Sequence, residues 1–199
     1  LGIELSVILG AAGIMTVAAG FAAQTAASNF ISGVFLLGER PFEVGETIQI
    51  YGTTGEVISI DLISIRLRPF DNLLVRIPNE SVMNSSVVNY TCFPIRRHDL
   101  KVVVDPVVDL EIVERVLLES TAATFILAEP KPIVIFLGFN ESGLEIQLSC
   151  WALREHFLEM RNQLHRDVAF SLQDAQIPLG YPTRVLRDFR SAAKTRVVA

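Results

Sequence analysis

The hydrophobic pattern begins with a continuous apolar stretch that is unlike the rest of the chain. Residues 5–38 carry no charged side chain. As a helix rising about 1.5 Å per residue, this stretch would be about 50 Å long, whereas a bilayer core needs only about 20 residues. The pattern therefore predicts one membrane-spanning helix within residues 1–39. It should end near Glu39, because Pro41 disfavours helical geometry at Arg40.

One face of this helix is built differently from its neighbours. Bulky apolar and then polar residues recur at steps of three and four, which places them on one face: Ile14, Val17, Phe21, Gln24 and Ser28. The flanking faces carry alanines and Gly10, Gly13 and Gly20, whose missing side chains allow close helix contact. One interpretation is a dimerisation helix. The other is a ring of copies.

In a ring, the small faces would pack neighbour to neighbour, and Val17 and Phe21 would point at a central axis. A narrow apolar neck expels water and so blocks ions without a plug. Gln24 and Ser28, further along, would line a wetter vestibule.

Two positions are candidates for a bend in the helix. Thr25 can bond back to a preceding carbonyl, and Gly33 weakens a helix by about 1 kcal/mol relative to Ala. The large residues 34–37 then predict a segment that is amphipathic or buried and does not line the neck.

Residues 42–91 alternate between apolar and polar positions and are divided by turn residues, which predicts short β-strands. The predicted strands are 47–50, 56–62, 63–67, 73–77 and 87–90. The apolar phase changes between Leu62 and Ile63, which requires an extra residue, so we expect a bulge or sharp bend there. Short, strongly bent strands predict a small, nearly closed barrel.

The pattern becomes mixed from Arg96 onwards. We expect strands at 100–104, 133–139 and 144–151 and helices over 110–123 and 155–175. Asp109 should cap the first helix, and residues 140–143 should form a hairpin loop. This order of elements predicts an α+β sandwich of the ferredoxin-like kind. Val185 and Leu186 predict a short strand in the tail.

Composition adds constraints on location and partners. Half of the residues are hydrophobic, and most of the excess lies in the opening stretch. That stretch is longer than the apolar run of a signal peptide and lacks its basic leading region. The chain opens on Leu, so we expect a processed or partial chain with segments missing upstream. A net charge of −5 argues against a nucleic-acid partner.

Candidate chemistry is sparse. The two cysteines, Cys92 and Cys150, indicate a reducing compartment. The three histidines have no partners at metal-ligand spacing, so no metal or cofactor is predicted. We find no nucleophile–base pair or carboxylate dyad. Residues 52–55 (Gly-Thr-Thr-Gly) are not a P-loop, because no Gly-Lys-Ser/Thr follows. A membrane-tethered enzyme is therefore disfavoured, and we expect no catalytic residues.

Several motifs together resemble the small-conductance mechanosensitive channel family over nearly the whole chain. A small-sided helix alone would be weak support, but this helix is followed by Arg-Pro-Phe and by a β segment ending in Ile-Pro-Asn. The motifs are Leu9-Gly10-Ala11-Ala12-Gly13, Gly20-Phe21-Ala22-Ala23-Gln24, Ser28-Asn29 with Gly33-Val34, Arg40-Pro41-Phe42 with Gly45-Glu46, and Ile77-Pro78-Asn79 with Asn89.

The resemblance implies a homoheptameric, tension-gated channel in the inner (plasma) membrane, multi-pass in its full length. It would release ions and small osmolytes during osmotic downshock. The implied domains are a pore-lining helix (1–39), an Sm-like β domain (40–95), a cytoplasmic α+β vestibule domain (96–180) and a C-terminal strand and tail (181–199).

The resemblance also assigns roles on the helix. Val17 and Phe21 fall at the pore seal, where the best-known member has Leu, so the neck can differ in width. Thr25 stands where that member has its hinge glycine, and Gly33 matches a second, lower hinge. Asp71-Asn72 replaces the commoner Asp-Gly turn. This should change little, because Asn also tolerates the positive φ that such a turn requires.

An Sm-like domain leaves one further alternative, a membrane-tethered structural or RNA-binding module. The basic residues available to contact RNA would be Arg66, Arg68, Arg76, Arg96 and Arg97. These arginines could equally line solute portals or pair with the surplus carboxylates, and salt-sensitive RNA retention would favour the RNA reading.

Overall fold

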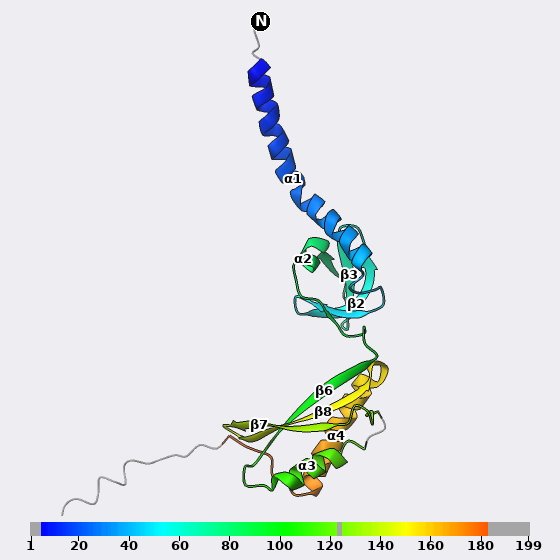
Figure 1. Ribbon diagram of the computed structural model, residues 1–199, viewed down its shortest axis with the longest axis vertical. Coiled ribbons are helices and arrows are strands. Elements are labelled where there is room, and N and C mark those ends of the chain that lie inside the picture. Colours follow the sequence, from blue (N-terminus) through cyan, green and yellow to red (C-terminus); the bar gives the residue numbers. More distant parts are fainter. Residues whose placement is uncertain (1–4, 123–124, 183–199) are drawn as a thin grey trace, which may run out of the picture. The chain divides into compact units, whose positions relative to one another are not determined.

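The computed structural model describes residues 5–122 and 125–182, which fall in two compact units, 1–93 and 94–199. The first unit holds a long helix and a β domain, and the second holds an α+β domain (Figure 1). The strand predicted around Val185 and Leu186 lies outside the described residues.

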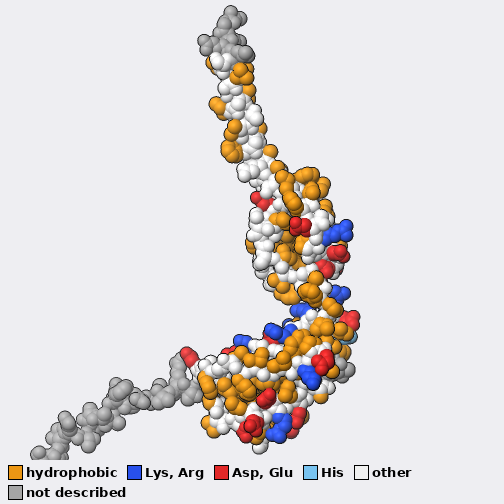
Figure 2. All heavy atoms as spheres, viewed as in Figure 1, with side chains coloured by type: hydrophobic (Ala, Val, Ile, Leu, Met, Phe, Trp, Pro, Cys, Tyr) orange, Lys and Arg blue, Asp and Glu red, His pale blue; other side chains and the backbone are white. Residues whose placement is uncertain are grey.

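The first unit begins with helix α1, Leu5–Glu39, which confirms the predicted single helix. Its most apolar window has a mean hydropathy of 1.9 and is not buried at all, and no other helix in the described ranges is long and apolar enough to cross a membrane. Figure 2 shows hydrophobic side chains exposed along it, and Figure 1 shows that α1 changes direction part-way. Arg40 ends the helix in a left-handed conformation (φ +47°), just before Pro41, as expected.

The β domain is one antiparallel sheet with the strand order β4-β3-β2-β1-β5. Its elements are β1 (Thr47–Ile50), β2 (Thr53–Ile60), β3 (Ser64–Pro69), β4 (Val75–Pro78), the short helix α2 (Asn79–Met83) and β5 (Val88–Asn89). Alternate apolar residues of β1, β2 and β3 form the core with Leu36 and Phe42 from the end of α1 and the loop after it.

The sharp bend expected between Leu62 and Ile63 is present as the turn between β2 and β3, and a further register shift, which was not expected there, lies inside β2 between Val57 and Ser59. Val57 is therefore buried, while Leu62 is exposed. Among the described strands, β4 and β5 are the sheet edges, so the sheet is not closed into a complete barrel. Helix α2 was not predicted. The Asp71-Asn72 turn does use a positive φ, +63° at Asn72.

The second unit has a three-stranded antiparallel sheet with both helices on one face (Figure 1). Its elements are β6 (Ile95–Val104), α3 (Leu110–Glu119), β7 (Ile133–Asn140), β8 (Gly143–Leu153), a 3₁₀ turn (Arg154–His156) and α4 (Phe157–Asp174). The order β6-β8-β7 is that of the first three strands of a ferredoxin-like fold. Leu179 bridges to Val104 on the free edge of β6, where the fourth strand of that fold would lie.

Local signals account for these elements. The Asp109 carboxylate accepts a hydrogen bond from the Glu111 amide at 3.0 Å and caps α3, as predicted. The Asn140 side chain accepts from the amides of Ser142 and Gly143 and closes the β7–β8 hairpin. The helix-period stripe of α4 is buried in the core against the sheet: Met160, Leu164, Val168 and Leu172.

Substitution of Leu164 tests this core. Leu164 is fully buried, so Leu164→Ala should lower the free energy of unfolding by about 2–5 kcal/mol. Phe170→Ala on the same helix, where Phe170 is 71% exposed, should change it by no more than about 0.5 kcal/mol. Urea titration followed by the fluorescence of the single tryptophan, Trp151, measures both. Equal losses would contradict the packing described.

A histidine pair lies between β6 and α4. The His98 Nε2 atom lies 3.2 Å from the His165 Nε2 atom. Burial, followed by His165 and Arg161, lowers the pKa of His98 below its ordinary 6.5, against an opposing effect of Asp99. A lowered folded-state pKa means that stability is complete above pH 6.5 and is lost as the pH falls through the folded pKa.

The unfolding free energy of this unit should therefore decrease below pH 6.5. His98→Gln should reduce that slope, whereas His156→Gln, which leaves the pair intact, should retain it. Urea titrations of the parent, His98→Gln and His156→Gln at and below pH 6.5, followed by the fluorescence of Trp151, provide the comparison. An unchanged slope in His98→Gln would show that another group is responsible.

Candidate functional site

The C-terminal part of α1 is packed directly against the β domain. Asn29 and Leu36 are 8% and 2% exposed and Gly33 between them is also buried, whereas residues 6–27 of the helix are exposed. Gly33 faces the turn between β2 and β3. A Cβ atom there would collide with the Leu62 carbonyl oxygen and lie 2.5 Å from the Asn79 side-chain nitrogen. The helix can approach this closely only because residue 33 has no side chain.

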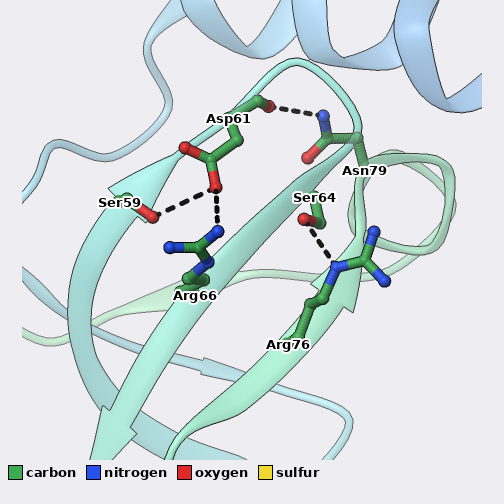
Figure 3. Close-up of polar contacts among 6 residues, drawn as sticks. All are labelled: Ser59, Asp61, Ser64, Arg66, Arg76 and Asn79. Atoms are coloured by element: carbon green, nitrogen blue, oxygen red, sulfur yellow. Dashed lines mark hydrogen bonds and ion pairs between the residues drawn. The ribbon is translucent and has the colours of Figure 1, made fainter.

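Two asparagines connect α1, the turn between β2 and β3, and the start of α2 through hydrogen bonds. The Asn29 side chain accepts from the Glu80 amide at 3.1 Å and donates to the Thr25 carbonyl at 2.8 Å. The fully buried Asn79 side chain donates to the Asp61 carbonyl at 2.9 Å, which Figure 3 shows, and to the Asn29 carbonyl at 3.5 Å. We call this set of contacts, with Gly33, the asparagine clasp.

The asparagine clasp was not anticipated from the sequence. Asn29 and Asn79 stand in sequence motifs, but nothing local to either residue indicates its partner. Gly33 was predicted as a hinge, and the structure places it in the tightest contact between α1 and the β domain. Thr25, the other candidate hinge, lies one turn before Asn29, and its carbonyl is part of the clasp.

The predicted neck residues lie upstream of the clasp on an uncovered part of α1. Val17, Phe21, Gln24 and Ser28 border one shallow groove of about 610 Å³ along the helix. Val17 and Phe21 are 59% and 73% exposed. A Cβ atom at Gly10, Gly13 or Gly20 would meet nothing within 4 Å. These faces are thus open to contact by other helices.

The described residues contain no group of three His, Cys, Asp or Glu side chains placed to hold a metal ion. Burial raises the pKa of the Cys150 thiol to about 12, so it stays protonated and unreactive. Arg68 and Arg97, two of the arginines considered for RNA, are paired with Glu56 and Asp99.

Comparison with known proteins agrees with this architecture. Residues 25–92 match the family model described as "Mechanosensitive ion channel, beta-domain", and residues 99–179 match "Mechanosensitive ion channel MscS, C-terminal". A protein of Archaeoglobus fulgidus, described as an MscS family protein, is 32% identical over 190 residues, covering 94% of this chain and 66% of its own length.

Two further proteins extend the likeness. The small-conductance mechanosensitive channel of Edwardsiella ictaluri is 29% identical over 83% of this chain and 58% of its own length. The crystal structure of Helicobacter pylori MscS in its closed state superposes with a TM-score of 0.87 over 94% of this chain and 75% of that one, at 23% identity. The latter establishes the fold.

The chain belongs to the MscS family of mechanosensitive ion channels, a family of channels and not of enzymes. It carries the family's N-terminal helix, β domain and C-terminal α+β domain. It spans 66% and 62% of the length of its relatives in Archaeoglobus and Synechocystis.

The close approach at Gly33 can be tested by adding one methyl group. Gly33→Ala should push α1 away from the β domain, and such overpacking costs about 1–3 kcal/mol. Exchange of the Glu80 amide hydrogen, now bonded to Asn29, should then accelerate about tenfold or more. Gly38→Ala is the control, because a Cβ atom there meets nothing within 4 Å. Hydrogen-exchange mass spectrometry of residues 79–83 reads both, and equal exchange would refute the contact.

Proposed function

We propose that this chain is the pore-forming part of a tension-gated ion channel. The observation that carries the proposal is an exposed helix without any charged residue from Leu5 to Gly38, continued directly into a family-matched β domain. Membrane tension favours the state of larger area, and opening releases ions and small osmolytes during osmotic downshock. The partners are the lipid bilayer, the permeating solutes and other copies of the chain, which form a homoheptamer.

In this assembly the α1 helices line the pore. Gly10, Gly13 and Gly20 lie in the contacts between neighbouring helices, where missing side chains allow backbones to approach. Val17 and Phe21 form the constriction, and Gln24 and Ser28 line the wider part that follows. With the neck closed, its apolar walls expel water and so block ions.

The remaining domains lie on the cytoplasmic side of the inner membrane. Residues 40–95 form the β domain below the pore, residues 96–180 enclose a vestibule, and residues 181–199 supply a C-terminal strand. The chain's net charge of −5 leaves no basic field for nucleic acid.

The asparagine clasp supports a location for the hinge. Gly33 and Asn29 are held against the β domain, so the helix cannot bend at Gly33 without breaking that contact. When tension moves the neck, the residues between Phe21 and Asn29 must absorb the change. Thr25 lies in this interval and is the hinge in this proposal, with Gly33 as a fixed point that yields only if the clasp opens.

The neck is tested by making it polar. Phe21→Ser should hydrate the constriction and give channels that conduct without applied tension and open at a lower threshold. Met15→Ser is the control, because Met15 is equally exposed but lies off the face shared by Val17 and Phe21. Patch recordings from reconstituted liposomes measure both variants. Unchanged resting conductance and threshold for Phe21→Ser would refute the neck.

A further inference from the structure

The histidine pair of the second unit lies at the rim of its core and has no part in the proposed function. His98 alternates with the buried Leu100 and Val102 along β6, so its side chain is on the face that the helices cover. His165 lies on α4 three residues before the buried Val168, at the edge of the packed face. His98 is half-buried and His165 is exposed, so the pair is open to solvent.

The two imidazole rings meet through the same kind of atom. Their Nε2 atoms are 3.2 Å apart, and the ring centroids are 5.4 Å apart with the planes inclined by 33°. Two nitrogen ligands of one tetrahedral zinc ion, each about 2.0–2.1 Å from the metal, lie about 3.3–3.4 Å from each other. The observed separation agrees with this value within the usual tolerance of about 0.2 Å. The geometry therefore suits a shared metal ion as well as a direct hydrogen bond.

The protonation state of His98 also suits a metal ligand. A metal ion binds only the neutral form of imidazole, because the proton of the charged form occupies the lone pair. Burial, followed by His165 and Arg161, lowers the pKa of His98 below its ordinary 6.5. His98 is therefore neutral at pH 7, and no proton competes with a metal for it.

Two arginines limit the affinity of such a site. The Arg96 guanidinium lies 3.7 Å from the centroid of the Phe157 ring, and Arg161 lies one turn before His165 on α4. Both arginines act electrostatically on His98, and both would repel a divalent cation. With two protein ligands in place of the usual four, we expect a dissociation constant of about 1–200 µM.

We propose that His98 and His165 bind one zinc ion per chain through their Nε2 atoms. No third His, Cys, Asp or Glu joins them within the described ranges, so water completes the coordination. Imidazole is a preferred ligand of zinc, and the separation of the two nitrogens matches the tetrahedral geometry that zinc adopts. The ion would connect β6 to α4 and stabilise the packing of this helix on the sheet. Binding requires neither the pore nor a membrane, so the inference is independent of the proposed function.

The test uses the full-length channel in detergent, without a polyhistidine tag, after metal has been removed with EDTA and the EDTA by dialysis. Isothermal titration calorimetry with zinc chloride at about pH 7.5 should give one zinc ion per chain. His98→Gln and His165→Gln should each weaken binding at least about tenfold, because each removes one of two ligands. Zinc at about 1 mM should raise the midpoint of thermal unfolding of the parent by about 3 °C or more, and that of neither variant. Because His165 is exposed, His165→Gln carries the test if His98→Gln does not fold.

Two further variants separate this site from other zinc ligands. His156→Gln is the matched control, because the His156 Nδ1 atom lies 3.0 Å from the Glu159 carboxylate, outside the pair, and this variant should bind zinc as the parent does. Arg161→Gln should bind zinc about threefold more tightly, because it removes a positive charge that acts on His98. A zinc ion bound elsewhere would not respond in this way.

Three outcomes would overturn the proposal. The first is no zinc binding by the parent up to about 1 mM, which would leave the pair as a hydrogen bond alone. The second is equal binding by the parent, His98→Gln and His165→Gln. The third is loss of binding in His156→Gln, which would place the ion at His156 and Glu159. Failure of the proposed function would leave these titrations unchanged, because they measure no current.

Discussion

The structure of the first unit depends on one close contact, between the backbone of α1 at Gly33 and the carbonyl of Leu62. No side chain fits there, so the helix and the turn between β2 and β3 meet through main-chain atoms. Beside this contact, Asn29 and Asn79 bond to three backbone groups, which are the Glu80 amide and the carbonyls of Asp61 and Asn29. This contact couples the end of α1 to the β domain, whereas a flexible linker would leave the two free to move independently.

The other features of the first unit can be located relative to this contact. The helix upstream of the clasp keeps its faces uncovered, so its small residues and its Val17–Phe21 face remain available to other copies of the chain. Downstream, the turn that receives Gly33 is held by Asn79, which donates to the Asp61 carbonyl. The predicted neck face, the candidate hinge at Thr25 and the asparagine clasp therefore follow one another along α1.

Much of the fold could be predicted because its signals are local. The absence of charge over residues 5–38 indicated the long helix, Pro41 its end, and Asp109 the start of α3. The period of the apolar residues in α4 identified the face that the structure buries. Less of the candidate site could be predicted from the sequence. The neck residues follow from helical spacing, but their role depends on copies of the chain that one sequence cannot place.

The sequence by itself determined the type and order of most of the described elements, the helix suited to a membrane and the family, because each rests on periodicity, turn chemistry or contiguous motifs. Only the tertiary structure decided that the bulge lies within β2, that α2 forms after Pro78, and that Gly33 is a contact as well as a candidate hinge. It also paired Asn29 with residues 50 and 51 positions away and set Arg66 opposite Arg76. Such pairings arise from strand register and packing, which join residues that carry no local sign of each other.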